Sequence, residues 1–211
     1  MSKDDKQEPE CLIDLIKRRR TCRFFKPVCE VPDKDINLIL EAARWAPSAR
    51  NLQPIEFVIV RDPQELKKLS VFARQNQPME SSVSVIVIGD LKRAKAVGDV
   101  SPHDVTTHFK GIKMFIYMDA AAAIQNMLLM AEALGYNTLW IASFDEDGLE
   151  DFMKLPQRFI PLSIICVGKK SKDLIIPPKR NLNTRVHKEV WSPKDQDESY
   201  IGFSKKINRR Y

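Results

Sequence analysis

The chain lacks a long uninterrupted hydrophobic stretch, since no run of eighteen apolar residues occurs in its 211 positions. A membrane-spanning helix is therefore not expected. Residues 1–10 also lack the apolar core of a signal peptide, because Lys, Asp and Glu fill most of these positions. We therefore expect a cytoplasmic protein, and we interpret residues 1–10 as a disordered leader.

Cysteine is scarce as well, and its spacing excludes the common metal and redox motifs. The four cysteines are Cys11, Cys22, Cys29 and Cys166, and no two of them form a Cys-x-x-Cys pair or a zinc-binding spacing. Free thiols in a reducing compartment are the expected state. A disulfide between Cys22 and Cys29 stays open from the sequence alone, although no other feature requires one.

The usual signatures of side-chain catalysis are absent too. The sequence contains no Gly-x-Ser-x-Gly, no His-Glu-x-x-His and no Gly-x-Gly-x-x-Gly. His103 and His108 stand five residues apart, which does not align them on one helix face, and we predict no metal site there. His187 has no assigned role. A chain without such motifs is better suited to holding a cofactor that carries out the chemistry.

What is present fits an ordinary globular protein. Hydrophobic residues make up 44% of the chain and charged residues 29%. The length suits a single domain, which we place at residues 11–191, followed by a polar tail over residues 192–211.

The formal net charge is +6, and the positive residues cluster at 17–26, 169–180 and 205–210. Such clusters attract nucleic acid or hold a phosphate and draw in an anionic dinucleotide. The chain lacks the glycine-aromatic signature of common RNA modules and any clear recognition helix. The small-anion interpretation is therefore favoured, and a non-enzymatic nucleic-acid-binding protein is the alternative.

A polar loop stands out in the first quarter of the chain. A helix is predicted to end near Trp45, because apolar residues recur at helical spacing before it and Pro47 follows it. The loop then carries a hydroxyl and two amides, Ser48, Asn51 and Gln53, before an apolar strand. Amides offer donors and acceptors together, which suits the edge of a flat heterocycle. An ordinary helix-to-strand turn is the alternative, since Ser, Asn and Pro are common turn residues.

A basic segment follows a short amphipathic helix predicted over residues 11–17. Arg19 and Arg23 stand four residues apart, so either a helix or an extended chain places them on one side, with Thr21 between them in the extended case. Two planar guanidinium groups suit phosphate oxygens. A solvated basic helix end is the alternative.

Residues 119–135 predict a helix of unusual character. Their composition is strongly helical, with Asp119 as the expected N-cap and Gly135 as the expected C′ residue. The segment is apolar on nearly all sides, so we expect it to be buried all round, either at the domain centre or at a subunit interface. The remaining predicted elements are strands over 57–60, 83–90 and 161–168, a strand that runs into a loop over 136–145, helices over 63–72 and 147–155, and irregular stretches over 73–82 and 91–113.

Three segments, in the right order, resemble the nitroreductase family of dimeric FMN enzymes. Pro47-Ser48-x-x-Asn51-x-Gln53-Pro54 resembles the flavin-contacting loop of that family, and Arg19-Arg20-Thr21-Cys22-Arg23 resembles its phosphate-binding segment. Residues 119–145 resemble its long interface helix and the strand that follows. The resemblance covers most of residues 12–190.

The resemblance implies an α+β fold of three α-β-α layers, with a central mixed, mainly antiparallel sheet, in a homodimer. It implies FMN as the cofactor, NADH or NADPH as the reductant, and sites at the dimer interface to which both subunits contribute. The implied phosphate contacts are Arg19, Thr21, Arg23 and Lys179 or Arg180. The implied ring and ribityl contacts are Arg20, Pro47, Ser48, Ala49, Asn51 and Gln53, with the backbone of Ala142 and Ser143 near flavin N5.

The reaction implied by the resemblance has two half-reactions at one place, with no side chain as catalyst. A hydride passes from NAD(P)H to flavin N5, and a nitroaromatic, quinone or flavin acceptor then takes it. A specialised flavoprotein of the same fold, such as an enone reductase, a dehalogenase or a flavin-processing enzyme, is the alternative. Three positions depart from the family pattern: Thr21 replaces Ser, Ile55 replaces an aromatic residue, and Ala142 replaces Gly. The resemblance also implies that residues 192–211 wrap around the partner subunit.

Overall fold

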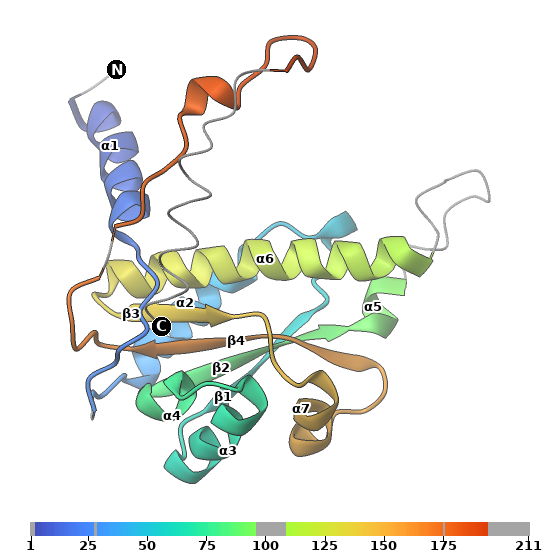
Figure 1. The fold of residues 1–211 in the computed structure, drawn as a ribbon. Coiled ribbons are helices and arrows are strands. Elements are labelled where there is room, and N and C mark those ends of the chain that lie inside the picture. Colours follow the sequence, from blue (N-terminus) through green and yellow to red (C-terminus); the bar gives the residue numbers. More distant parts are fainter. Residues whose placement is uncertain (1–2, 28, 96–108, 175, 194–211) are drawn as a thin grey trace. The chain divides into compact units, whose positions relative to one another are not determined.

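The computed structural model of the protein describes residues 3–27, 29–95, 109–174 and 176–193 (Figure 1). The chain divides into two compact units, Met1–Leu174 and Ile175–Tyr211. The described part of the second unit contains the short 3₁₀ helix η4 (Leu182–Thr184). The domain expected over residues 11–191 therefore spans the first unit and part of the second. The boundary between the units, after Leu174, lies in the basic, proline-broken segment that follows β4.

A four-stranded antiparallel sheet forms the centre of the first unit (Figure 1). Its strands lie in the order β1-β2-β4-β3, and each neighbouring pair is antiparallel. The bounds are β1 (Ile55–Val60), β2 (Val83–Asp90), β3 (Asn137–Ile141) and β4 (Phe159–Gly168). The predicted strands are thus confirmed. The sheet was expected to mix parallel and antiparallel pairs, but all of its strand pairs are antiparallel, and the parallel pairing found is an isolated bridge between Thr21 and Thr138.

Helices cover both faces of this sheet and bury its central strands on both sides. Along β2, Val85 and Val87 pack into one cluster with residues of α2 and α6, whereas Ile86 and Ile88 pack into a second cluster with residues of α3 and α7. This two-residue period is that of a strand whose two faces are both apolar. The helices are α2 (Asp33–Arg44), α3 (Pro63–Ala73), α6 (Phe109–Ala133) and α7 (Glu146–Met153).

The N-terminal helix is longer than expected. Helix α1 spans Lys3–Arg18, so residues 3–10 are helical and the prediction of a disordered leader is wrong for them. Lys, Gln and Glu favour helix even where no apolar stripe marks one, and Pro9 lies inside this helix. Two short helices also occupy stretches predicted to be irregular, α4 (Gln77–Glu80) and α5 (Leu91–Lys95).

Helix α6 differs from its prediction at one end and agrees with it at the other. It begins at Phe109, so Asp119 lies in its interior and is not its N-cap. At the other end Gly135 has a φ of +77°, and the Tyr136 amide donates to the Ala131 carbonyl, as in a helix ended by a left-handed glycine.

One side of α6 carries apolar side chains that are exposed in the described part of the chain. Met114 and Met118 are 56% and 59% exposed, and Tyr117 between them is exposed as well. These three residues precede the segment 119–135 for which burial was expected. Within that segment Gln125, Ala133 and Gly135 are exposed and all other residues are buried or half-buried, so the expectation holds except at these three positions. The two expected positions of this helix, domain centre and subunit interface, both stay predictions.

The segment Met114–Ala133 is also long and apolar enough to cross a membrane, with a hydropathy of 1.3. A single helix of this kind is weak grounds for a membrane span, since the core helix of a soluble protein meets the same criteria. Here the opposite side of α6 packs against α2 and the sheet. A cytoplasmic location stays a prediction.

All four cysteines are free thiols, so the disulfide left open between Cys22 and Cys29 does not form. Within the described residues, no group of three or more His, Cys, Asp and Glu side chains could hold a metal ion. His103 and His108 lie outside those residues. In the second unit, the Nδ1 atom of His187 accepts a hydrogen bond from the Ser192 amide at 3.2 Å.

Candidate functional site

The polar loop between α2 and β1 has an unusual backbone. Its residues form the 3₁₀ turn η1 (Ala49–Asn51), and Arg50, Asn51 and Gln53 have φ values of 51°, 56° and 49°. Positive φ is uncommon for residues other than glycine, so three such residues among four mark a strained segment. Strained backbone of this kind is concentrated at binding and catalytic sites. An ordinary helix-to-strand turn does not require three residues with positive φ.

Hydrogen bonds within the loop hold this conformation. The Ser48 Oγ atom accepts from the Gln53 amide at 3.0 Å, and the Gln53 side chain donates to Asn51 Oδ1, also at 3.0 Å. The Asn51 amide donates to the Ser48 carbonyl at 2.9 Å. The hydroxyl and the two amides singled out from the sequence therefore contact one another.

Helix α6 supports the loop from beneath. The buried Asp119 carboxylate accepts from the Ala49 amide at 3.0 Å, and the Asn126 side chain donates to the Ala42 carbonyl at 3.0 Å. Burial raises the pKa of the Asp119 carboxyl above its ordinary value, and the hydrogen bond from Ala49 opposes part of this rise. Two polar side chains on one apolar helix thus contact the end of α2 and the loop that follows it.

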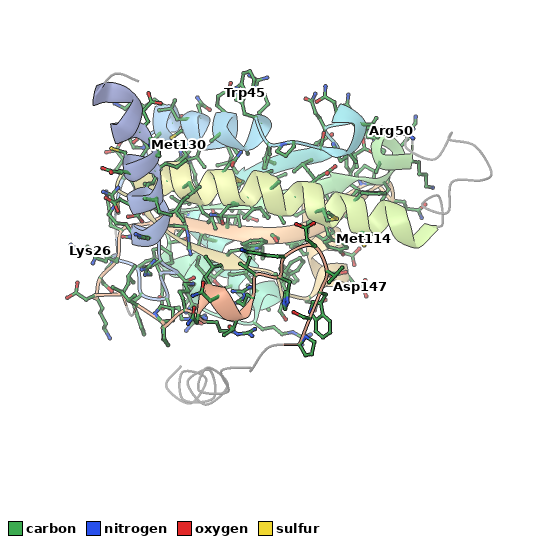
Figure 2. All side chains as sticks on the ribbon, turned by 90° about the horizontal axis from the view of Figure 1, so that it is seen from above. Lys26, Trp45, Arg50, Met114, Met130 and Asp147 are labelled. Carbon is green, nitrogen blue, oxygen red and sulfur yellow. The ribbon has the colours of Figure 1, made fainter. Side chains whose placement is uncertain are left out.

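A pocket of about 240 Å³ lies where the loop, α2, β1 and α6 meet. Pro47, Ser48 and Gln53 line it on the loop side. Figure 2 shows Trp45 and Arg50 on the side of α6 that α2 occupies. The other lining residues come from α2, β1, α5 and α6, and are Ala43, Arg44, Ala46, Ile55, Phe57, Arg93, Asp119 and Ala123.

A second pocket, of about 230 Å³, lies beside β3 and contains part of the basic segment. Arg19 and Thr21 line it together with Thr138 and Trp140 of β3 and with Gln125 and Leu128 of α6. The segment is extended here, because α1 ends at Arg18 and the Cys22 amide donates to the Thr138 carbonyl at 2.8 Å. The extended alternative for this segment is therefore the correct one, with Arg19 and Thr21 on one side and Cys22 in the core.

Arg19, the cation that lines this second pocket, and its neighbour Arg20 are only partly compensated. Burial lowers the pKa of the Arg19 guanidinium, the like charge of Arg20 lowers it further, and Glu132 opposes both effects. The Arg20 Nη1 atom donates to the Arg19 carbonyl at 2.8 Å, but the buried Arg20 Nε has no hydrogen-bond partner among the described residues. Adjacent, partly desolvated cations with an unused donor are what an anionic ligand would satisfy.

The two pockets are separate within the chain. Asp119 and Ala123 face the loop pocket, whereas Gln125 and Leu128 face the arginine pocket. At about 100° per residue, Gln125 points roughly 200° away from Ala123 around the α6 axis. One chain therefore does not bring the arginine segment and the polar loop around a common cavity.

The other expected site residues are placed as follows. Ala142 and Ser143 directly follow β3 and are exposed, whereas Arg23 is half-buried and does not line the arginine pocket. The Arg23 carbonyl accepts from the Gln77 side chain at 3.3 Å. Lys179 and Arg180 lie in the second unit.

Sequence reasoning missed several lining residues. Gln125, Thr138 and Trp140 line the arginine pocket, and Arg93 and Asp119 line the loop pocket. A polar residue inside an otherwise apolar helix was the available signal for Asp119, since burying a polar group requires a partner. Gln125 stands out in the same way in the sequence, although it is exposed in the structure. The strand residues carry no such signal.

Comparison with known proteins gives a consistent result. The sequence model described as "Nitroreductase family" matches residues 16–169. A protein of Archaeoglobus fulgidus named "Putative NADH dehydrogenase/NAD(P)H nitroreductase" is 31% identical over 189 residues, which cover 86% of this chain and 99% of that protein. The NADPH-flavin oxidoreductase of Vibrio harveyi is 24% identical over 88% of this chain and 77% of its own length.

A solved structure shows the same fold. The NADPH:FMN oxidoreductase from Vibrio harveyi complexed with NAD⁺ superimposes with a TM-score of 0.77 at 22% identity, covering 95% of this chain and 86% of that one. The chain is therefore an oxidoreductase enzyme that belongs to the nitroreductase family.

Proposed function

We propose that the protein is a homodimeric FMN-dependent oxidoreductase that takes reducing equivalents from NADH or NADPH. The observation that carries this proposal is the arginine pocket, which Arg19 and Thr21 line and in which the Arg19 guanidinium is partly desolvated beside the like charge of the adjacent Arg20. Arg20 does not line the pocket itself, but its buried Nε has no partner among the described residues. A phosphate monoester would supply the missing negative charge and acceptors. The name of the Vibrio harveyi structure, an FMN oxidoreductase complexed with NAD⁺, supports the same pair of ligands.

The chemistry of the residues present fits FMN, although of the named phosphate contacts only Arg19 and Thr21 line the arginine pocket. Arg19, Thr21 and Arg23, with Lys179 or Arg180, would hold the phosphate. The groups that would contact the ring and the ribityl chain are Arg20, Pro47, Ser48, Ala49, Asn51 and Gln53, with the backbone of Ala142 and Ser143. When bound, FMN supplies hydride transfer at N5, from the nicotinamide to a nitroaromatic, quinone or flavin acceptor in a ping-pong sequence.

The protein's own contribution is binding and orientation. The strained loop offers amide donors and acceptors in a conformation fixed before ligand binding, which lowers the cost of ordering on association. The arginine pocket neutralises the phosphate. Stacking of an aromatic acceptor on a flat ring would discriminate only weakly among acceptors, which is consistent with the proposed breadth.

We propose that each site is completed by two subunits. The arginine pocket and the loop pocket lie on different sides of α6 in one chain, so both groups can reach one ligand only if a partner supplies one of them. The exposed apolar residues of α6, and Leu12, Ile13 and Ile16 on α1, provide the surface for such a contact. Figure 2 shows Met114 on the side of α6 away from Trp45.

A spectrum tests the cofactor. Protein loaded with FMN and freed of excess ligand by gel filtration should be yellow, and it should bleach when NADH or NADPH is added without oxygen. Addition of a quinone or nitroaromatic should restore the colour. A colourless protein that ignores added FMN would refute the proposal.

Mixing two defective variants tests the shared site. Arg19→Met and Asn51→Ala each lie in a different group, so a dimer containing one of each has one intact site if the groups come from different subunits. Random exchange should then restore about a quarter of all sites, as a two-fold symmetric dimer requires. No restoration after exchange, verified with differently tagged subunits, would show that both groups belong to one chain.

A further inference from the structure

Asp119 is a buried carboxylate inside α6 that neither caps the helix nor adds to its apolar packing. Asp119 lies ten residues after the first residue of α6, so it is too far inside to cap the helix. The residue is 8% exposed, and its two oxygens lie 3.0 and 3.3 Å from the Ala49 amide nitrogen. A carboxylate is costly to bury unless it is hydrogen-bonded, so this contact needs an explanation.

The loop that Asp119 contacts is one that would not hold its shape unaided. Arg50, Asn51 and Gln53 have positive φ, which side chains with a Cβ disfavour. The hydrogen bonds inside the loop join residues 48–53 to one another, whereas the Ala49–Asp119 bond joins the loop to a core helix 70 positions away in the sequence. Strained segments persist only where the surrounding structure over-determines them.

We propose that Asp119 is a positioning residue, which holds the Ser48–Gln53 loop in its flavin-contacting conformation through the Ala49 amide. This inference rests on the proposed function, because it assumes that the loop contacts FMN. Without Asp119 the left-handed residues relax towards ordinary backbone angles, and FMN binding then has to reorder the loop. That ordering cost weakens the affinity without removing any atom that touches the ligand.

The environment of Asp119 supports a hydrogen-bonding role over a purely ionic one. The charged side chains that line the same pocket are Arg44 of α2 and Arg93 of α5, and neither forms an ion pair with Asp119 within 4.0 Å in the described residues. The Arg44 guanidinium instead pairs with Glu41 at 2.5 Å. A neutral acceptor of the same shape at position 119 should therefore keep the loop in place.

The test compares Asp119→Ala, Asp119→Asn and a matched control, Asp62→Ala. Asp62 also accepts backbone amides, from Gln64 and Glu65, but it caps α3 and does not contact the loop. Fluorescence titration with FMN should show affinity about tenfold or more weaker for Asp119→Ala, and within a few-fold of the native value for Asp119→Asn and Asp62→Ala. The native-like affinity of the asparagine variant would be the rescue that general destabilisation does not produce.

A second measurement uses the protein without cofactor. Amide hydrogen exchange at Ala49 should be slow in the native protein and in Asp119→Asn, and faster in Asp119→Ala, while β2 amides stay protected in all three. Equal exchange at Ala49 in the native and alanine proteins would overturn the inference, as would equal loss of FMN affinity in all three variants. If the native protein ignores FMN, the proposed function fails, while the exchange result still decides whether Asp119 holds the loop.

Discussion

Replacement of Arg19 by methionine should weaken FMN binding without lowering the stability of the free protein. Methionine keeps an unbranched apolar stem in the pocket and removes only the guanidinium. In the free protein that guanidinium is partly desolvated beside Arg20, which is why its pKa lies below the ordinary value. Removal of a poorly compensated cation should leave the free energy of unfolding unchanged or raise it.

The affinity should fall by an amount set by one charge-assisted contact. Hydrogen bonds to charged groups contribute about 1.5–3 kcal/mol, which corresponds to roughly 10- to 150-fold in the FMN dissociation constant. Arg19→Lys should fall between the two, because an ammonium group keeps the charge but not the planar fork. Titration by flavin fluorescence gives the affinity, and urea unfolding of the cofactor-free protein gives the stability.

Arg18→Met is the matched control. Arg18 is the neighbouring residue, its side chain is 64% exposed, and its closest acidic partner, Glu132, lies 3.9 Å away. The control removes the same charge from the same segment and should change FMN affinity far less than Arg19→Met does. Equal affinities for Arg19→Met and the native protein, or equal losses in both variants, would refute the assignment of Arg19 to a phosphate site.

Three further outcomes follow from the core. Gly89→Ala should lower the free energy of unfolding by about 1–3 kcal/mol in denaturant titrations, because the new Cβ would lie 2.7 Å from Ile116 Cγ2; an unchanged midpoint would contradict this. Tyr136→Phe removes the hydrogen bond from the Tyr136 hydroxyl to Asp35, 2.7 Å long, and should lower stability by about 1 kcal/mol at neutral pH. The fold raises the pKa of Tyr136 to about 12 from 10.0, chiefly by burial, so native stability should decline between pH 10 and 12 and the phenylalanine variant should lack that part of the decline. Cys166 is 0% exposed, and this burial also raises the pKa of its thiol to about 12, so a thiol reagent should modify Cys166 only when the protein opens; rapid labelling of the native protein would be inconsistent with the structure.

Local patterns were sufficient to predict much of the fold. The proline that follows Trp45 ends α2 as expected, and the β-branched run over residues 83–90 forms the buried strand β2. The N-terminal boundary of α6 was missed, because an aspartate before an alanine run has the same local appearance as an N-cap. Its actual hydrogen-bond partner, Ala49, is 70 positions away, and a local pattern contains no information about that distance.

The candidate site was predicted in its parts but not in its arrangement. Arg19 and Thr21 share a pocket because an extended chain alternates its sides, and that alternation can be derived from spacing alone. Arg23 would continue the alternation but does not line that pocket. The separation of this pocket from the Ser48 loop depends on which sides of α6 face them, and therefore on packing between elements distant in sequence.

Strand β3 sets the spacing between two parts of the proposed site, because the parallel bridge between Thr21 and Thr138 attaches the arginine segment near its start. The start of β3 fixes the segment that would hold the phosphate, and Ala142, directly after the end of β3, would approach the flavin ring. Each residue of a strand advances the chain by about 3.3 Å, so one residue inserted between these points would increase the distance between them by that amount. It would also turn every later side chain of the strand to the opposite face of the sheet. Insertions in this strand should therefore be tolerated far less well than insertions in the loops around it.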